Sequence, residues 1–116
     1  MSALAMELTK KHCLPCEGGV PRLSTADVSA FLEGLPNWKL RADGQGIRRE
    51  WRLKDFSTAL AFFSRVGDVA EQEGHHPDLH LTGFRNAAIE ISTHAVGGLT
   101  ENDFILAAKI DTIPVD

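Results

Sequence analysis

Histidines are concentrated in one short stretch of this chain. Residues 71–83 read EQEGHHPDLHLTG, so that His75 and His76 precede a proline and His80 follows shortly after, in a chain with five histidines in all. Imidazole titrates near neutral pH, so one histidine can protonate a leaving group while a second accepts a proton. Two or more histidines brought together by the fold, with His94 as a further candidate, would therefore suit general acid–base catalysis.

Two other interpretations of these histidines stay open. A single histidine at the end of a helix or strand is commonly solvated or bonded to a backbone group. A zinc site is disfavoured, because the adjacent side chains of His75 and His76 tend to point in different directions and the spaced ligands of a zincin-type helix are missing. The residue pattern therefore predicts no metal site at these histidines.

A second motif lies near the N-terminus, where residues 12–16 read HCLPC and place His12 beside a Cys-x-x-Cys pair. This pair is half of a zinc ribbon, but the chain has no second pair to complete four ligands. A thioredoxin-like role would need the motif to open a helix after a strand, whereas Pro and Gly residues surround it. We expect an arm that is disordered or packed on a partner.

Size and charge limit the possible functions. A chain of 116 residues fits one domain. The net charge of −4 disfavours nucleic-acid binding, which needs clustered Lys and Arg. No apolar run approaches the roughly 20 residues of a membrane span, and the first residues lack the pattern of a secretory signal. These features predict a cytoplasmic protein whose cysteines are reduced and that binds neither nucleic acid nor membranes.

The elements that would position the histidines follow from periodicity and capping. Residues 1–23 lack sustained periodicity and are expected to form an irregular arm, with residues 24–116 as the folded domain. The expected elements are a helix over 24–35 with Ser24 as N-cap, a hairpin over 38–53 turning at DGQG, an amphipathic helix over 56–72 closed by Gly74, strands over 78–82 and 87–94, and a helix after Thr100 and Asp103 that stops at Pro114.

This αββαββα order predicts an α+β fold, in which a four-stranded antiparallel sheet carries three helices packed on one face. His75 and His76 would lie on the turn between the long helix and the third strand, and His94 at the exit of the fourth strand. If the last two strands form a hairpin, its open end brings His94 back beside His75 and His76. Three imidazoles would then share one opening.

The spacing of these residues resembles the signature of the pterin-4a-carbinolamine dehydratase family. The signature has an acidic residue, three further residues, His-His-Pro, an aromatic residue, another histidine and an aspartate. The matching residues here are Glu71, His75, His76, Pro77, Phe84, His94 and Asp103. Similarity also covers LPNWKL with Trp38, WRLKDFSTALAFFSRV, and STH ahead of GGLTENDF, and so extends over essentially all of residues 24–112.

The resemblance implies dehydration of 4a-hydroxytetrahydrobiopterin, the pterin-4a-carbinolamine, to the quinonoid dihydropterin, with no metal or cofactor. It places His75, His76 and His94 around the reacting carbon, with His76 and His94 as the proton-transfer pair and His75 in a positioning role. The substrate-binding residues that it implies are Glu71, Pro77, Ser92, Thr93, Asp103 and Trp38. Asp103 could orient a histidine or cap a helix, and Trp38 could wall the pocket or be buried in the core.

The same resemblance implies a homodimer or homotetramer. HHPDLHL and GGLTENDFILAAKID are most similar to the plant-chloroplast and carboxysome-associated branch of the family. Members of that branch have been linked to assembly of Rubisco, so the alternative function is a Rubisco assembly factor with little or no dehydratase activity, located at the carboxysome. Fold and histidines can persist while the function changes.

Overall fold

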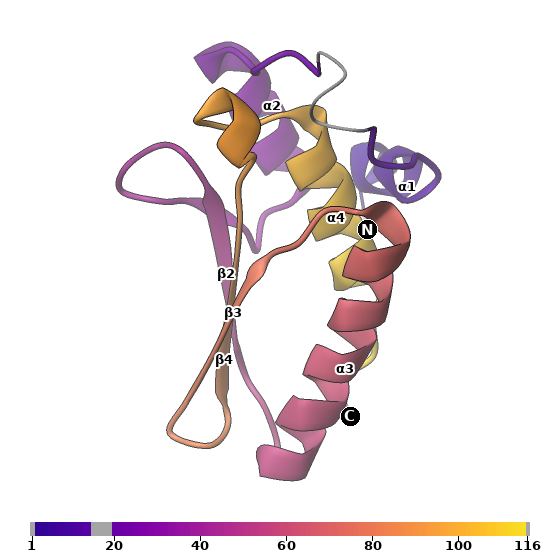
Figure 1. The fold of residues 1–116 in the computed structure, drawn as a ribbon, viewed down its shortest axis with the longest axis vertical. Helices are drawn as coiled ribbons and strands as arrows, with labels where there is room; N and C mark the ends of the chain where they lie inside the picture. The colour runs from indigo at the N-terminus through magenta and orange to yellow at the C-terminus, as the bar shows by residue number, and fades with distance from the viewer. Residues whose placement is uncertain (1, 15–19, 116) are drawn as a thin grey trace.

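The structure is a computed structural model that describes residues 2–14 and 20–115. Within these residues the chain forms an α+β fold with one four-stranded antiparallel sheet, as predicted, and with helices on one side of it (Figure 1). The elements in chain order are α1 (Ala3–Thr9), α2 (Thr25–Gly34), β1 (Lys39–Leu40), β2 (Ile47–Arg52), α3 (Phe56–Glu73), β3 (Asp78–Thr82), β4 (Asn86–Ile91), the 3-10 helix η2 (His94–Val96) and α4 (Glu101–Asp111).

The sheet has the strand order β1-β2-β4-β3, with antiparallel pairing throughout. Both predicted hairpins are present, and Gly44 and Gly83 occupy the left-handed region in their turns, with φ of 71° and 53°. Ile47 pairs with Ile91 in the β2–β4 register, and both side chains are buried on the helix-covered face. Alternation along β2 turns Arg48 and Glu50 to the other face, which no helix covers.

Helix α3 packs on one side of the core and ends directly before His75 and His76. Asp55 caps its first turn by accepting a hydrogen bond from the Thr58 N–H at 2.8 Å. Gly74 ends it in the left-handed conformation, at φ 63°, and so turns the chain toward His75. Among the described residues no helix, this longest one included, is both long and apolar enough to cross a bilayer.

Helix α4 is the centre of the fold. A capping box between Thr100 and Asp103 starts the helix, as the sequence predicts. Its side chains are enclosed on almost every side, since α1, α3 and the sheet surround it. The residues that are at most 2% exposed are Asn102, Asp103, Phe104, Ile105, Leu106, Ala107, Ala108 and Ile110.

The expectation of an irregular arm over residues 1–23 was wrong for its first part, because Ala3–Thr9 form a helix, α1, which raises the described α-helices to four. Ser2 caps this helix by accepting a hydrogen bond from the Ala5 N–H at 3.0 Å. Ala5 and Leu8 are 1% exposed and pack on the core beside α4. Seven residues are too few to be stable or periodic alone, so packing determines this helix and the sequence pattern did not predict it.

Candidate active site

The centre of the candidate site is a buried pair formed by His75 and Asp103. His75 follows the glycine that ends α3, and Asp103 lies in the first turn of α4. Nε2 of His75 lies 2.7 Å from Oδ1 of Asp103, and the two residues are 6% and 0% exposed. An ionised carboxylate can only accept, so Nε2 of His75 carries the proton in this bond. The pair therefore fixes both the position and the tautomer of His75.

The second oxygen of Asp103 is also held by hydrogen bonds. Oδ2 accepts from the Thr93 hydroxyl at 2.9 Å and from the Thr100 N–H at 2.8 Å. The two threonine hydroxyls lie 3.0 Å apart. A buried carboxylate with donors on both oxygens cannot rotate without breaking bonds, and each broken bond would leave an unsatisfied polar group. Asp103 is thus a rigid acceptor for His75.

His76 differs from His75 in being open to solvent. Its side chain is 64% exposed, and its Nε2 lies 3.1 Å from Oε1 of Glu71, which is 78% exposed. Exposed pairs of this kind contribute little to stability, because water competes for both partners. His76 and Glu71 are therefore free to exchange this contact for a contact with a ligand.

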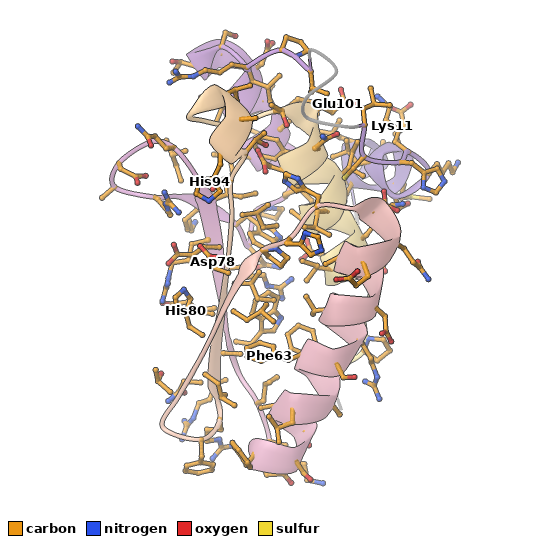
Figure 2. The ribbon with its side chains drawn as sticks, in the orientation of Figure 1. Lys11, Phe63, Asp78, His80, His94 and Glu101 are labelled. Atoms are coloured by element: carbon orange, nitrogen blue, oxygen red, sulfur yellow. The ribbon has the colours of Figure 1, made fainter. Side chains whose placement is uncertain are left out.

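His94 directly follows Thr93, at the end of the hydrogen-bond network that runs from His75 through Asp103. It is exposed and starts η2, directly after the buried Thr93 (Figure 2). Thr93 is fixed from both sides, because its hydroxyl donates to Asp103 and its N–H donates to the Gly98 carbonyl at 2.9 Å. The hydrogen bonds from His75 through Asp103 to Thr93 thus join the two chain segments that carry His75, His76 and His94.

Two residues predicted to contact substrate have other roles in the structure. Trp38 is 2% exposed in the core, and its Nε1–H donates to Oδ1 of Asp111 at 2.9 Å. Asp111 follows Asp103 by eight residues, or about 12 Å along α4, so Trp38 does not wall this site. Thr93 is 1% exposed and its hydroxyl is directed at Asp103.

Two further predicted binding residues, Pro77 and Ser92, are half-buried. Pro77 directly follows His76 in the sequence, and Ser92 precedes His94 by two residues.

The aromatic residue of the signature is also remote. Phe84 lies in the β3–β4 turn, at the opposite end of β4 from His94 and η2 (Figure 1). His80 lies on β3 and is likewise outside the site. It is on the uncovered face of the sheet, 3.8 Å from Oε2 of Glu90 (Figure 2). Of the four histidines considered in the sequence, the structure thus separates His80 from the other three.

Sequence reasoning missed Asn102, one of the polar side chains that hold the site from behind. The buried polar residues of the described chain are His75, Thr93, Thr100, Asn102 and Asp103. Asn102 appears in the sequence only as one residue of a helix start, TENDF, and nothing in that pattern distinguishes it from an exposed asparagine. The side chain of Asn102 binds the backbone of Leu14, in the segment after α1, and the sequence did not predict this contact.

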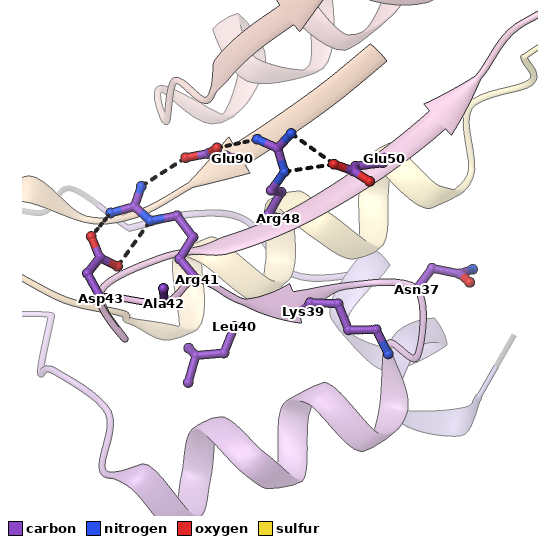
Figure 3. A pocket seen from close by; sticks show the side chains of 9 residues that line it. All are labelled: Asn37, Lys39, Leu40, Arg41, Ala42, Asp43, Arg48, Glu50 and Glu90. Atoms are coloured by element: carbon purple, nitrogen blue, oxygen red, sulfur yellow. Dashed lines mark hydrogen bonds and ion pairs between the residues drawn. The ribbon is translucent and has the colours of Figure 1, made fainter. Parts of the chain in front are cut away.

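A hollow on the uncovered face of the sheet has a different character. It measures about 750 Å³ and its lining includes Arg41, Arg48 and Glu90. These charges pair with one another: Arg41 and Arg48 both donate to Glu90, and Arg41 also donates to Asp43 at 2.7 Å (Figure 3). None of the lining residues is a histidine or cysteine. The hollow therefore lacks the acid–base groups of the histidine site.

Over residues 2–14 and 20–115, the structure has no group of three or more His, Cys, Asp or Glu side chains arranged to hold a metal ion. Of the Cys-x-x-Cys motif only Cys13 can be described, since Cys16 lies outside the described residues.

Comparison with known proteins shows which family this chain resembles. Residues 21–113 match the family model described as pterin 4 alpha carbinolamine dehydratase. The chain is 50% identical to pterin-4-alpha-carbinolamine dehydratase 2, mitochondrial, of Arabidopsis thaliana, over 95% of this chain and only 60% of that longer protein. It is 45% identical to a putative pterin-4-alpha-carbinolamine dehydratase of Halorhodospira halophila, over 93% of this chain and 98% of the relative.

Two solved structures share the fold. A transcriptional coactivator/pterin dehydratase from Brucella melitensis superposes with a TM-score of 0.74 at 30% identity, covering 78% of this chain and 96% of that one. A pterin dehydratase-like protein described as a RuBisCO assembly factor in the alpha-carboxysome superposes with a TM-score of 0.55 at 18% identity, covering 65% of this chain and 86% of that one. The second likeness is one of fold alone.

Proposed function

Because this chain belongs to the pterin-4a-carbinolamine dehydratase family, we propose that it dehydrates 4a-hydroxytetrahydrobiopterin to the quinonoid dihydropterin by histidine acid–base catalysis. The observation that carries this proposal is the buried His75–Asp103 pair, which joins the exposed His76 and His94 through Thr93. A rigid imidazole, with accessible imidazoles on the two segments that its hydrogen bonds join, suits a reaction that needs two proton transfers.

The chemistry assigns a task to each histidine. A proton from one imidazole reaches the 4a-hydroxyl group, the C4a–O bond breaks, and water leaves. The N5 lone pair forms the C4a=N5 double bond, and a second imidazole accepts the N5 proton, so that atoms and charge balance. His76 and His94 are the proton-transfer pair because both are exposed. His75, held by Asp103, positions the substrate between them.

The remaining binding roles follow from exposure. Glu71 is exposed on the last turns of α3, where its carboxylate can accept hydrogen bonds from the amino-pyrimidine edge of the pterin. Pro77 and Ser92, both half-buried, line the site beside the ring. Asp103 and Thr93 act behind His75 and do not contact the pterin.

The assembly proposed for this domain is a homodimer or homotetramer in the cytoplasm. β3 is an edge strand, with β4 as its one neighbour in the sheet, and Leu79 on it is 41% exposed. An unpaired edge with an exposed apolar side chain is stabilised by pairing with a second copy about a two-fold axis.

A stopped-flow assay of carbinolamine dehydration tests the proposed function. The wild-type protein is expected to accelerate dehydration well above the spontaneous rate, with an acceleration that follows imidazole protonation near neutral pH. Rubisco assembly is the alternative, and likeness of fold alone does not favour it. A rate equal to that of buffer, together with Rubisco subunits retained on the protein in a pull-down, would replace the dehydratase proposal with the assembly role.

A further inference from the structure

Residues 11–14, here named the N-terminal strap, cross from the end of α3 to the start of α4. The N–H of Cys13 donates to Oε1 of Glu73 at 2.7 Å. The backbone of Leu14 makes two bonds with the side chain of Asn102: its N–H donates to Oδ1 at 2.9 Å, and its carbonyl accepts from Nδ2 at 2.7 Å. The strap therefore binds through its backbone to two side chains of the folded domain.

Both of these side chains belong to the protein interior. The side chain of Glu73 is 3% exposed and Asn102 is 1% exposed. Burial opposes ionisation of Glu73, but hydrogen bonds from Lys109 and from the Cys13 N–H outweigh it and lower the pKa of this carboxyl to about 2. Detaching the strap would break these hydrogen bonds of the buried side chains of Glu73 and Asn102, which is costly.

The attachment points of the strap flank the His75–Asp103 pair. Glu73 precedes His75 by two residues, and Asn102 directly precedes Asp103. Lys11 adds an ion pair to Glu101, the first residue of α4, at 2.8 Å (Figure 2). The contacts of the strap with Glu73, Asn102 and Glu101 thus fall on the last turn of α3 or the first turn of α4, the two turns whose separation sets the contact between His75 and Asp103.

The thiol of Cys13 does not suggest a reactive or metal-binding role for the strap. Burial first, and then the nearby charge of Glu73, raise the pKa of this thiol to about 12. Its Sγ lies 3.5 Å from the Asn102 carbonyl oxygen. A thiol that keeps its proton at neutral pH is a poor nucleophile and a poor metal ligand.

We propose that the N-terminal strap positions the His75–Asp103 pair, with Glu73 and Asn102 as the positioning residues through which it acts. The strap lies outside residues 21–113, the segment that matches the family model, so the family signature does not account for it. The catalytic consequence rests on the proposed dehydratase function. The geometric consequence does not, because it concerns only the hydrogen bond between His75 and Asp103.

Leu14 offers a matched pair of variants. Its side chain is 64% exposed, so Leu14→Ala removes little packing and keeps the N–H that binds Asn102. Leu14→Pro removes that N–H and leaves every side chain of α3 and α4 unchanged. Leu14→Pro is expected to lower kcat for dehydration about tenfold or more with KM nearly unchanged, because small displacements of catalytic groups have effects of this size. Leu14→Ala is expected to behave as wild type.

Glu73 offers a second pair that acts from the other side of the contact. Glu73→Gln keeps an acceptor for the Cys13 N–H, whereas Glu73→Ala removes it, so Gln is expected to recover most of the kcat that Ala loses. All variants are compared well below their melting temperatures.

NMR of the imidazole nitrogens tests the positioning role of the strap independently of the proposed dehydratase function. The Nε2–H signal of His75 is expected to broaden through faster exchange in Leu14→Pro and to stay unchanged in Leu14→Ala. If Leu14→Pro folds and its His75 signal is that of wild type, the proposed positioning role of the strap is wrong, whatever the dehydration activity of the variant. If the His75 signal changes in Leu14→Pro and the wild-type protein does not accelerate dehydration, the positioning role of the strap is supported and only the proposed dehydratase function is wrong.

Discussion

The ammonium group of Lys109 lies 2.6 Å from the carboxylate of Glu73 and so joins α4 to the last turn of α3. The two side chains are 14% and 3% exposed, which limits screening by water. Removal of either partner would leave the other buried and charged, and the cost of such an uncompensated charge exceeds the net contribution of the intact pair.

Acid should weaken this contact in a defined pH window. The pKa of Glu73 is lowered from 4.5 to about 2, so the folded state binds this proton less tightly than the unfolded state does. The resulting stability, on the order of 3 kcal/mol, is present above about pH 5 and is lost as pH falls toward 2. Denaturant unfolding of wild type and Glu73→Gln at several pH values checks this. The stability difference should shrink below pH 4.5, and a difference constant from pH 7 to pH 3 would contradict it.

The exposed histidines should affect rate without affecting stability. His76→Ala and His94→Ala are each expected to lower the dehydration rate by about 10² or more, the scale of positioned acid–base groups. Their melting temperatures should stay close to that of wild type, since both side chains are exposed. His80→Ala is the matched control, because His80 is an exposed histidine on the far face of the sheet. An equal loss of rate in His80→Ala would disprove the assignment of the site.

Substitutions of Asp103 should instead affect both rate and stability. Asp103→Ala removes the acceptor of three donors, on His75, Thr93 and Thr100, and is expected to cost at least about 2 kcal/mol in unfolding free energy. Asp103→Asn keeps one acceptor oxygen and should cost less. Chemical denaturation and the dehydration assay check the series. Full stability in Asp103→Ala would mean that the threonines and His75 find other partners.

The edge strand β3 predicts the effect of a charge on assembly. Leu79→Lys places an ammonium group on this edge and is expected to shift a dimer or tetramer toward monomer in sedimentation at micromolar concentration. Leu40→Lys is the control, since Leu40 is similarly exposed, at 46% against 41%, on β1 at the opposite edge. A wild-type protein that sediments as a monomer would refute association through β3, and equal effects of the two substitutions would exclude a specific role for this edge.

Local sequence signals predicted most of the fold. Ser24, Gly74 and Thr100 act within one helical turn of their own positions, and the structure has all three in their expected capping roles. The hairpin of β3 and β4 followed from alternation around Gly83, because register and face depend on a two-residue period.

Tertiary packing determined what the sequence did not predict. Trp38 could be a pocket wall or part of the core by pattern alone, and only its contact with Asp111, 73 residues away, decides between them. Helix α1 is held by the packing of Ala5 and Leu8 on the core, and the side chain of Asn102 binds the backbone of Leu14; neither segment has a periodic signal of its own. Within the site, the pairing of His75 with Asp103 involves residues 28 apart.

The central position of α4 has a consequence for synthesis on the ribosome. The sheet and α3 are translated before residue 101, yet Ile47, Ile89 and Ile91 have no complete cover until α4 has left the exit tunnel. A nascent chain that ends before α4 therefore presents a bare apolar surface, the type of surface that aggregates or recruits chaperones. Folding of this domain is thus coupled to the emergence of one late helix.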